Sequence, residues 1–186
     1  MFAIQNFLQM SITIKDKKFV PFITAQQIEN RITELAKRID TDYAGKQVLC
    51  IGILNGSFIF AADLARALNL SIEFTFIKYT SYHKMISSGE VDKLIGLTSE
   101  VKNRHVLLIE DIIDTGLTMT EIINDMQQLQ PASLEIVSLL LKPSALQEDL
   151  DIKYIGFEIE NKFVVGYGLD YDGYGRNLKD IHIVAQ

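Results

Sequence analysis

The stretch "HVLLIEDIIDTGLTM", residues 105–119, decides the fold because an apolar strand runs here through a short turn into a helix. Residues 105–111 are apolar enough for a strand that is covered on both faces of a sheet. Helical spacing of apolar residues starts at Thr118 and continues to residue 129. Three carboxylates, Glu110, Asp111 and Asp114, stand directly before the turn, and their role there needs an explanation.

The same pattern of buried strands and amphipathic helices continues on both sides of this stretch. Apolar runs predict strands over 47–54, 71–79 and 134–141. Apolar residues spaced by three and four predict helices over 24–40 and 57–68, and Thr24 is the expected N-cap of the first of these helices. Alternating strands and helices imply right-handed crossovers and parallel strands. We therefore predict an α/β fold with a mostly parallel twisted central sheet flanked by helices, in one domain of residues 1–186.

Residues 80–103 interrupt this order with a polar segment that has no clear period. Loops of this length inside a compact domain are usually functional lids or disordered segments. We expect one of these two states here.

Composition narrows the class of protein and its location. The chain has 18 basic and 24 acidic side chains, a net charge of −6, which argues against a nucleic-acid binder. A single cysteine, Cys50, lies in an apolar run and fits a reducing, cytoplasmic setting. The N-terminus lacks a signal-peptide pattern, and no run reaches the roughly 18 apolar residues that indicate a membrane span.

The turn after the strand has the properties of an anion site. Ligands of open parallel sheets bind beyond the carboxyl ends of the strands, and N–H groups at a helix start suit a phosphate. Thr115, Gly116, Leu117 and Thr118 can offer such groups. For "DTG" alone, a solvated turn with capping threonines is the better explanation. The full ten residues 110–119 favour a sugar phosphate, because the carboxylates can hold ribose hydroxyls or Mg²⁺ while the turn holds the 5′-phosphate.

This stretch resembles the phosphoribosyl-pyrophosphate loop of the purine phosphoribosyltransferases, and most of all that of the hypoxanthine-guanine members. Further matches run from about residue 20 to the C-terminus: "LNGS" (54–57), "SY" (81–82) with "SSGEV" (87–91), "LLLKPS" (139–144) and "GFEIENKFVVGYGLDYDGYGRNL" (156–178). The resemblance implies the type I phosphoribosyltransferase fold, with a small hood built from terminal segments. It also implies a mobile catalytic loop at about 80–103 that contains Ser81 and Tyr82.

For the sugar substrate, the resemblance implies a pyrophosphate loop formed by Asn55, Gly56 and Ser57. A cis peptide between Leu54 and Asn55 would precede it. Arg176 would be a pyrophosphate clamp, or else a surface arginine. Many members carry a basic residue where Asn55 stands, and some where Leu117 stands, so direct charge contacts from these positions are in doubt.

For the base, the resemblance implies a pocket formed by residues of the segments 139–144 and 156–178. Lys142 would donate to the purine O6, although a lone lysine is more often solvated. Phe163 would stack on the ring, although such an aromatic is by default core, and Val164 would pair with the base through its main chain. Asp170 is either a polar loop carboxylate or a Mg²⁺ partner near the base.

The resulting prediction is a Mg²⁺-dependent hypoxanthine phosphoribosyltransferase that also accepts guanine. Glu110, Asp111 and Asp170 are the expected metal-binding residues, and Asp114 is the expected general base or charge partner at the purine N7. Partners would be phosphoribosyl pyrophosphate and a 6-oxopurine, with no nucleic acid and no membrane, in a homodimer or homotetramer. Alternatives are preference for xanthine or guanine, a nucleotide-sensing RNA-binding regulator of the same fold, and a nucleotide-binding module without turnover.

Overall fold

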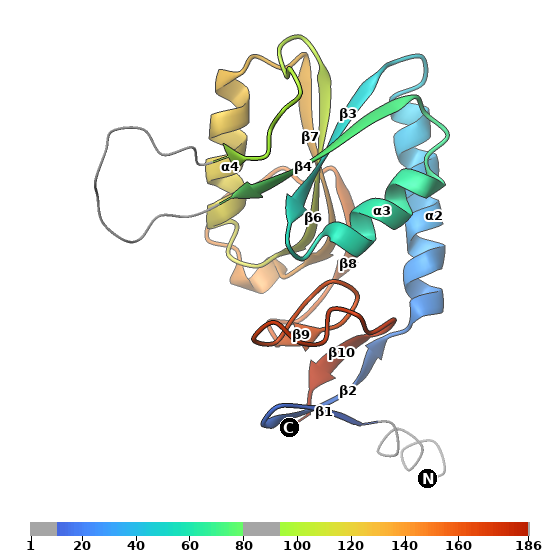
Figure 1. Cartoon of the computed structure of the whole chain (residues 1–186), viewed down its shortest axis with the longest axis vertical. Coiled ribbons are helices and arrows are strands. Elements are labelled where there is room, and N and C mark those ends of the chain that lie inside the picture. Colours follow the sequence, from blue (N-terminus) through green and yellow to red (C-terminus); the bar gives the residue numbers. More distant parts are fainter. Residues whose placement is uncertain (1–10, 80–93, 186) are drawn as a thin grey trace, which may run out of the picture.

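A six-stranded sheet forms the centre of the molecule (Figure 1). The computed structural model describes residues 11–79 and 94–185. In spatial order the strands are β5 (Leu94–Ile95), β4 (Ile72–Tyr79), β3 (Val48–Leu54), β6 (His105–Ile113), β7 (Ser133–Leu141) and β8 (Tyr154–Glu158). Neighbouring strands are parallel except for β4 and β5, which are antiparallel. The predicted parallel α/β sheet is confirmed.

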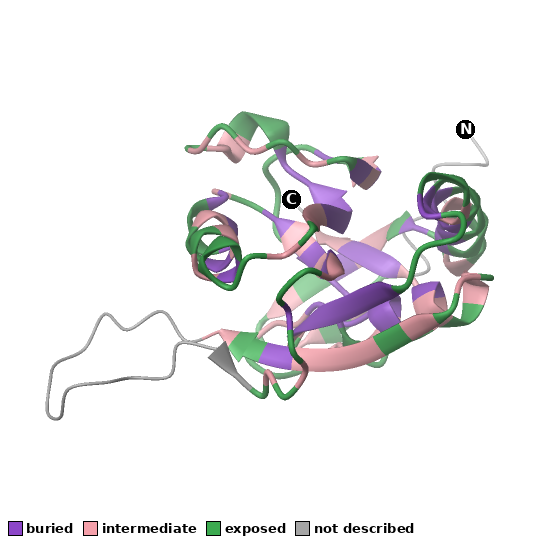
Figure 2. Ribbon diagram, turned by 90° about the horizontal axis from the view of Figure 1, so that it is seen from above, coloured by how far each residue is buried: buried purple, intermediate pink, exposed green. Residues whose placement is uncertain are grey.

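Helices cover both faces of this sheet. Figure 1 shows α2 (Ala25–Asp42) and α3 (Phe58–Ala67) on one side and α4 (Leu117–Gln128) on the other. Two apolar cores result, one under α2 and α3 and one under α4. The central strands lie between the two cores, which is why their sequences are mostly apolar without alternation. Much of their length is coloured as buried in Figure 2.

Local sequence sets the start of α2. The Thr24 hydroxyl accepts from the Gln27 N–H at 3.3 Å, and the Gln27 side chain accepts from the Thr24 N–H at 2.9 Å. This reciprocal pair is a capping box, which satisfies helix-start donors that would otherwise lack a partner. The predicted N-cap is confirmed.

Segments near the two ends of the described chain form a second sheet, the hood, below the central sheet in Figure 1. Its strands are β1 (Ile12–Ile14), β2 (Lys17–Ile23), β10 (Ile181–Val184) and β9 (Val164–Val165), in that spatial order and all antiparallel. The expectation of a small hood built from terminal segments is confirmed. Its strands were not located from the sequence, because two to seven residues carry too little periodicity.

Several predicted boundaries were wrong. Strand β6 continues to Ile113, two residues past the predicted end, so Glu110 and Asp111 lie inside the strand rather than at its end. Helix α4 starts at Leu117, one residue before the predicted start. In the polar segment 80–103, residues 94–95 form β5 against β4, and Val101 is buried; residues 80–93 lie outside the described part of the chain. Strand β8 and the short 3₁₀ helix η1 (Pro143–Ala145) were not predicted.

Within residues 11–79 and 94–185, no helix is both long enough and apolar enough to cross a membrane.

Candidate functional site

The carboxyl ends of β3, β6 and β7 place residues 55–57, the three carboxylates Glu110, Asp111 and Asp114, and Lys142 at one edge of the central sheet. A cavity of about 320 Å³ opens there. Its walls come from the ends of β3, β4 and β6 and from the start of α4: Ile53, Leu54, Tyr79, Glu110, Asp111, Ile112, Ile113, Asp114, Thr115, Gly116, Thr118 and Met119. The structure therefore gathers three carboxylates and the following turn around one space, as the sequence analysis expected.

The turn between β6 and α4 depends on a glycine. Gly116 has φ +82°, a left-handed conformation that side chains other than glycine adopt reluctantly. A Cβ there would lie 2.8 Å from a Leu150 methyl group, and the Gln147 N–H donates to the Thr115 carbonyl at 2.9 Å. The segment that follows β7 thus braces the turn, a contact that local sequence did not reveal.

The N–H groups of residues 115–118 are available to a ligand. The first N–H groups of a helix have no intrahelical acceptor. Throughout the described ranges, 11–79 and 94–185, the structure shows no protein acceptor for these four groups. Thr118 and Leu117 are exposed, with Leu117 46% exposed. This arrangement suits an anion at the start of α4.

Glu110 and Asp111 form a crowded acidic pair. Asp111 is buried, and its N–H donates to a Glu110 carboxylate oxygen at 3.2 Å. Burial, followed by the hydrogen bond and charge of Asp111, raises the pKa of Glu110 well above its ordinary range. No lysine, arginine or histidine of the described chain forms a salt bridge with either carboxylate. A cation or a pair of hydroxyl donors is therefore the kind of ligand that would relieve this pair.

The loop after β3 is pressed against the acidic pair. The peptide bond between Leu54 and Asn55 is cis, as the resemblance implied. A Cβ on Gly56 would fall 1.6 Å from Oδ2 of Asp111, so only glycine fits this position. The Ser57 hydroxyl is buried and donates to the Ile53 carbonyl at 2.5 Å, whereas Asn55 is exposed. Ser57 thus shapes the turn with its side chain, and only its main chain is left for a ligand.

Lys142 and Asp114 meet at this edge, although the sequence analysis had given them separate roles. The Lys142 Nζ donates to Oδ2 of Asp114 at 2.6 Å. The lysine side chain is 8% exposed and the aspartate side chain 48% exposed. Lys142 is therefore not the solvated lysine of the default interpretation; its ammonium group is held beside the cavity.

The aromatic residue predicted to stack on a base lies at the hood. Phe163 is 42% exposed, and its ring contacts the Tyr171 ring edge-on at 5.6 Å between centroids. The ammonium group of Lys17 lies 5.7 Å from the Phe163 centroid. Val164 is buried in β9. The default core interpretation of Phe163 is wrong, because two fifths of this side chain stays open to a ligand.

Asp170 and Arg176 are paired with each other. Arg176 donates to Oδ1 of Asp170 at 2.6 Å and to the Gly168 carbonyl at 2.6 Å, while the Gly173 N–H donates to Oδ2 of Asp170 at 2.6 Å. Each would have to exchange a protein partner for a ligand before acting as the predicted metal ligand or pyrophosphate clamp. Ser81 and Tyr82 lie outside the described residues.

The carboxylates of this site fit a Mg²⁺ ion that is bound jointly by protein and substrate. No group of three or more His, Cys, Asp or Glu side chains is arranged to hold a metal in the described part of the chain. Mg²⁺ is usually held by one or two carboxylates together with water and substrate phosphates. Glu110 and Asp111, crowded and without a cationic partner, supply two carboxylates of this type. The site thus fits a Mg²⁺ ion that arrives with a phosphorylated substrate.

A parallel α/β sheet in which an acidic strand end leads into an open helix start is typical of domains that bind phosphorylated sugars or nucleotides. The phosphoribosyl transferase domain model matches residues 23–172 of this chain. The chain therefore belongs to the phosphoribosyl transferase family.

Three proteins of known activity are similar to this chain over most of its length. A hypoxanthine-guanine phosphoribosyltransferase of Mycobacterium avium is 41% identical over 86% of this chain and 82% of its own length. The crystal structure of a hypoxanthine phosphoribosyltransferase from Staphylococcus aureus has a TM-score of 0.82 at 38% identity, covering 98% of this chain and 95% of that one. A Trypanosoma cruzi hypoxanthine phosphoribosyltransferase, in complex with the product IMP, has a TM-score of 0.82 at 34% identity over 94% and 87% of the two chains.

Proposed function

We propose that this protein transfers the 5-phosphoribosyl group from phosphoribosyl pyrophosphate to hypoxanthine, and also to guanine, releasing pyrophosphate in purine salvage. The observation that carries the proposal is the Lys142–Asp114 pair, 2.6 Å apart at the same sheet edge as the acidic pair and the open helix start. One edge would thus combine groups for a phosphate, a ribose and a 6-oxopurine. The names of the relatives support this substrate class.

The sugar substrate would be held by two loops and the acidic pair. The N–H groups of residues 115–118 would bind the 5′-phosphate, and the carboxylates of Glu110 and Asp111 would hold the ribose diol. The main chain of residues 55–57, with Arg176 once released from Asp170, would face the pyrophosphate. Glu110 and Asp111 would hold Mg²⁺, with Asp170 as a further ligand. The chemistry that this ion would supply is neutralisation of charge on the departing pyrophosphate.

The base would be selected by hydrogen bonding. Lysine has three N–H donors and no acceptor, so Lys142 can keep one bond to Asp114 and donate another to a purine O6. A 6-amino group cannot accept that bond. Phe163 would stack on the ring, and the main chain of Val164 would pair with the edge of the base. Asp114, being half exposed, can then accept the N7 proton or stabilise it.

The assembly and location of the protein form a separate part of the proposal. We infer a homodimer or homotetramer in the cytoplasm, where a free, buried cysteine stays reduced. Light scattering of the purified protein measures the mass directly. A monomer at micromolar concentration would contradict the proposed assembly without touching the proposed reaction.

The decisive experiment measures pyrophosphate release with hypoxanthine, guanine, xanthine and adenine in parallel, each with phosphoribosyl pyrophosphate and Mg²⁺. We expect turnover with hypoxanthine and guanine and almost none with adenine. Xanthine as the preferred base would replace the proposed substrate within the same reaction. No release with any of the four bases would refute the proposed function.

A further inference from the structure

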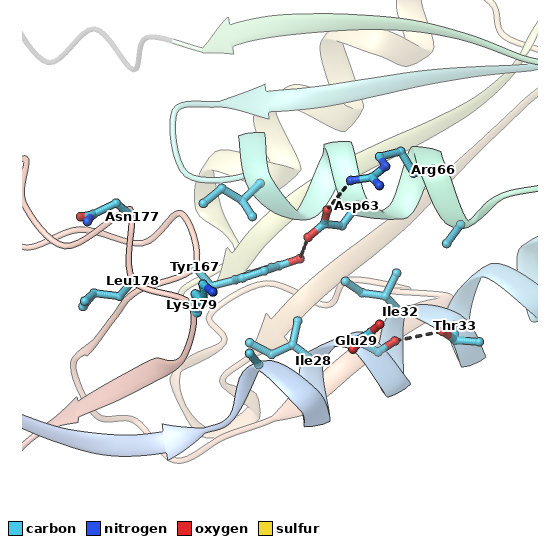
Figure 3. A pocket seen from close by; sticks show the side chains of 13 residues that line it. Ile28, Glu29, Ile32, Thr33, Asp63, Arg66, Tyr167, Asn177, Leu178 and Lys179 are labelled. Atoms are coloured by element: carbon cyan, nitrogen blue, oxygen red, sulfur yellow. Dashed lines mark hydrogen bonds and ion pairs between the residues drawn. The ribbon is translucent and has the colours of Figure 1, made fainter. Parts of the chain in front are cut away.

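Tyr167 connects the C-terminal segment to helix α3. Figure 3 shows its side chain crossing to α3, where its hydroxyl donates to Oδ2 of Asp63 at 2.6 Å. Tyr167 is only 7% exposed, and it forms part of the wall of a groove of about 560 Å³ between α2, α3 and residues 177–179. Burial and the hydrogen bond to Asp63 raise the pKa of Tyr167 well above its ordinary range, so the hydroxyl remains a donor at neutral pH.

The backbone at Tyr167 adopts a conformation that tyrosine disfavours. Its φ is +51°, and the flanking Gly166 and Gly168 have φ of +107° and +100°. Residues other than glycine hold such conformations only where their surroundings enforce them, and these positions gather at functional sites. The Tyr167 N–H donates to the Leu178 carbonyl at 2.9 Å, and the Gly168 N–H donates to the Arg176 carbonyl at 2.9 Å. The whole turn is thus held in place by hydrogen bonds on both sides of the side chain.

This turn rests on the loop proposed to bind pyrophosphate. A Cβ on Gly168 would lie 2.1 Å from the Gly56 carbonyl oxygen, and a Cβ on Gly56 would lie 1.6 Å from Asp111. Because α3 follows the loop directly, Asp63 is attached to the same loop from its other side. The hydrogen bond from Tyr167 to Asp63 therefore links α3 to the turn at Gly168, and this turn in turn contacts residues 55–57, which lead into α3.

We propose that Asp63 and Tyr167 are a positioning pair for the pyrophosphate loop. Neither side chain lines the cavity at the sheet edge, so the pair acts through Gly168 and Gly56 and not by touching substrate. It sets the distance between the loop and the 166–178 segment, and with it the affinity for pyrophosphate. This inference rests on the proposed function, because it assigns a role within that reaction.

The pair has a matched control elsewhere in the same chain. The Tyr154 hydroxyl donates to Asp42 at 2.7 Å, and Tyr154 is fully buried. That bond joins the start of β8 to the last residue of α2, and neither Tyr154 nor Asp42 lines the cavity at the sheet edge. A loss that is merely structural should look the same for the two tyrosines.

The test compares Tyr167→Phe with Tyr154→Phe. Each removes one hydroxyl and leaves one aspartate without its tyrosine donor. Asp42 keeps its ion pair with Lys153 at 3.3 Å, and Asp63 keeps its ion pair with Arg66 at 3.9 Å. For Tyr167→Phe we expect the inhibition constant of pyrophosphate and the KM for phosphoribosyl pyrophosphate to rise about fivefold or more, an effect the size of one ordinary hydrogen bond. The KM for hypoxanthine should change less than about twofold. For Tyr154→Phe all three constants should stay within about twofold of wild type. The Tm should fall by a similar amount in both variants.

A second pair of variants separates positioning from folding. Asp63→Asn keeps an acceptor for Tyr167 and should restore most of the pyrophosphate affinity that Asp63→Ala loses. Equal pyrophosphate constants for Tyr167→Phe and Tyr154→Phe, or equal losses for Asp63→Asn and Asp63→Ala, would overturn the positioning role. A wild-type protein that releases no pyrophosphate would instead refute the proposed function on which the inference rests.

Discussion

Replacing Lys142 with methionine tests base selection with little damage to the fold. Methionine keeps an unbranched side chain in the buried space that the lysine stem fills, and it removes the charged donor. Asp114 loses its partner, but its side chain is 48% exposed, so water can replace the lysine. We expect the stability loss to be below about 1 kcal/mol, as for other ion pairs that reach the surface.

The loss of activity should be much larger than the loss of stability. A hydrogen bond from a charged group contributes about 1.5–3 kcal/mol. At about 1.4 kcal/mol per factor of ten, removing the bond to the purine O6 lowers kcat/KM for hypoxanthine roughly 10- to 150-fold. The KM for phosphoribosyl pyrophosphate should stay within about twofold, because Lys142 has no place in the proposed sugar site. The kcat/KM for adenine should fall little, because adenine cannot accept this hydrogen bond in the wild-type protein either.

The assay is steady-state pyrophosphate release with each substrate varied in turn. The control is Lys153→Met, which removes a lysine ion-paired to Asp42 at 3.3 Å and to Glu135 at 3.8 Å, just before the start of β8. That variant should keep all kinetic constants. Wild-type kcat/KM for hypoxanthine in Lys142→Met would remove this lysine from base selection. A tenfold rise in the KM for hypoxanthine and in the KM for phosphoribosyl pyrophosphate alike would place Lys142 in a different subsite.

Three further predictions concern the acidic turn, the pyrophosphate loop and the core. Asp114→Asn removes the proton acceptor and should lower kcat about 10²- to 10⁴-fold at nearly unchanged KM for the sugar substrate; a near-wild-type kcat would exclude it from the chemical step. Gly56→Ala forces a methyl group onto Asp111 and should raise the KM for phosphoribosyl pyrophosphate, whereas Gly45→Ala, which meets no atom within 4 Å, should not; equal constants would refute this packing. Burial raises the pKa of Cys50 to about 12, so about one thiol in ten thousand is ionised at pH 8. A thiol reagent should therefore label the native protein only at its rate of unfolding, and rapid labelling would contradict the burial.

The central sheet and the acidic turn follow from local sequence. The mostly apolar runs over 47–54, 105–111 and 134–141 favour strands covered on both faces, because none of them alternates between polar and apolar residues as a half-exposed strand does. The helical stripes between them imply parallel strands. Parallel strands bring their carboxyl ends to one edge, so the meeting of Glu110, Asp111 and the following turn in one cavity could be predicted from order alone.

Contacts between distant segments could only be seen in the tertiary structure. The hood strands have two to seven residues and pair across up to 165 positions of sequence, as Phe19 in β2 and Val184 in β10 do. Such short strands carry no usable period, and they are stable only when chain topology brings them together.

The same reason applies to the details of the site. Lys142 bonds to Asp114 across 28 residues and Tyr167 to Asp63 across 104. The sequence singled out Lys142 and Asp114 as site residues but gave no reason to single out Asp63 or Tyr167. Which donor reaches which acceptor depends on side-chain direction at distances of 2.6 Å, and that is set by how the parallel sheet, its helices and the hood pack against one another.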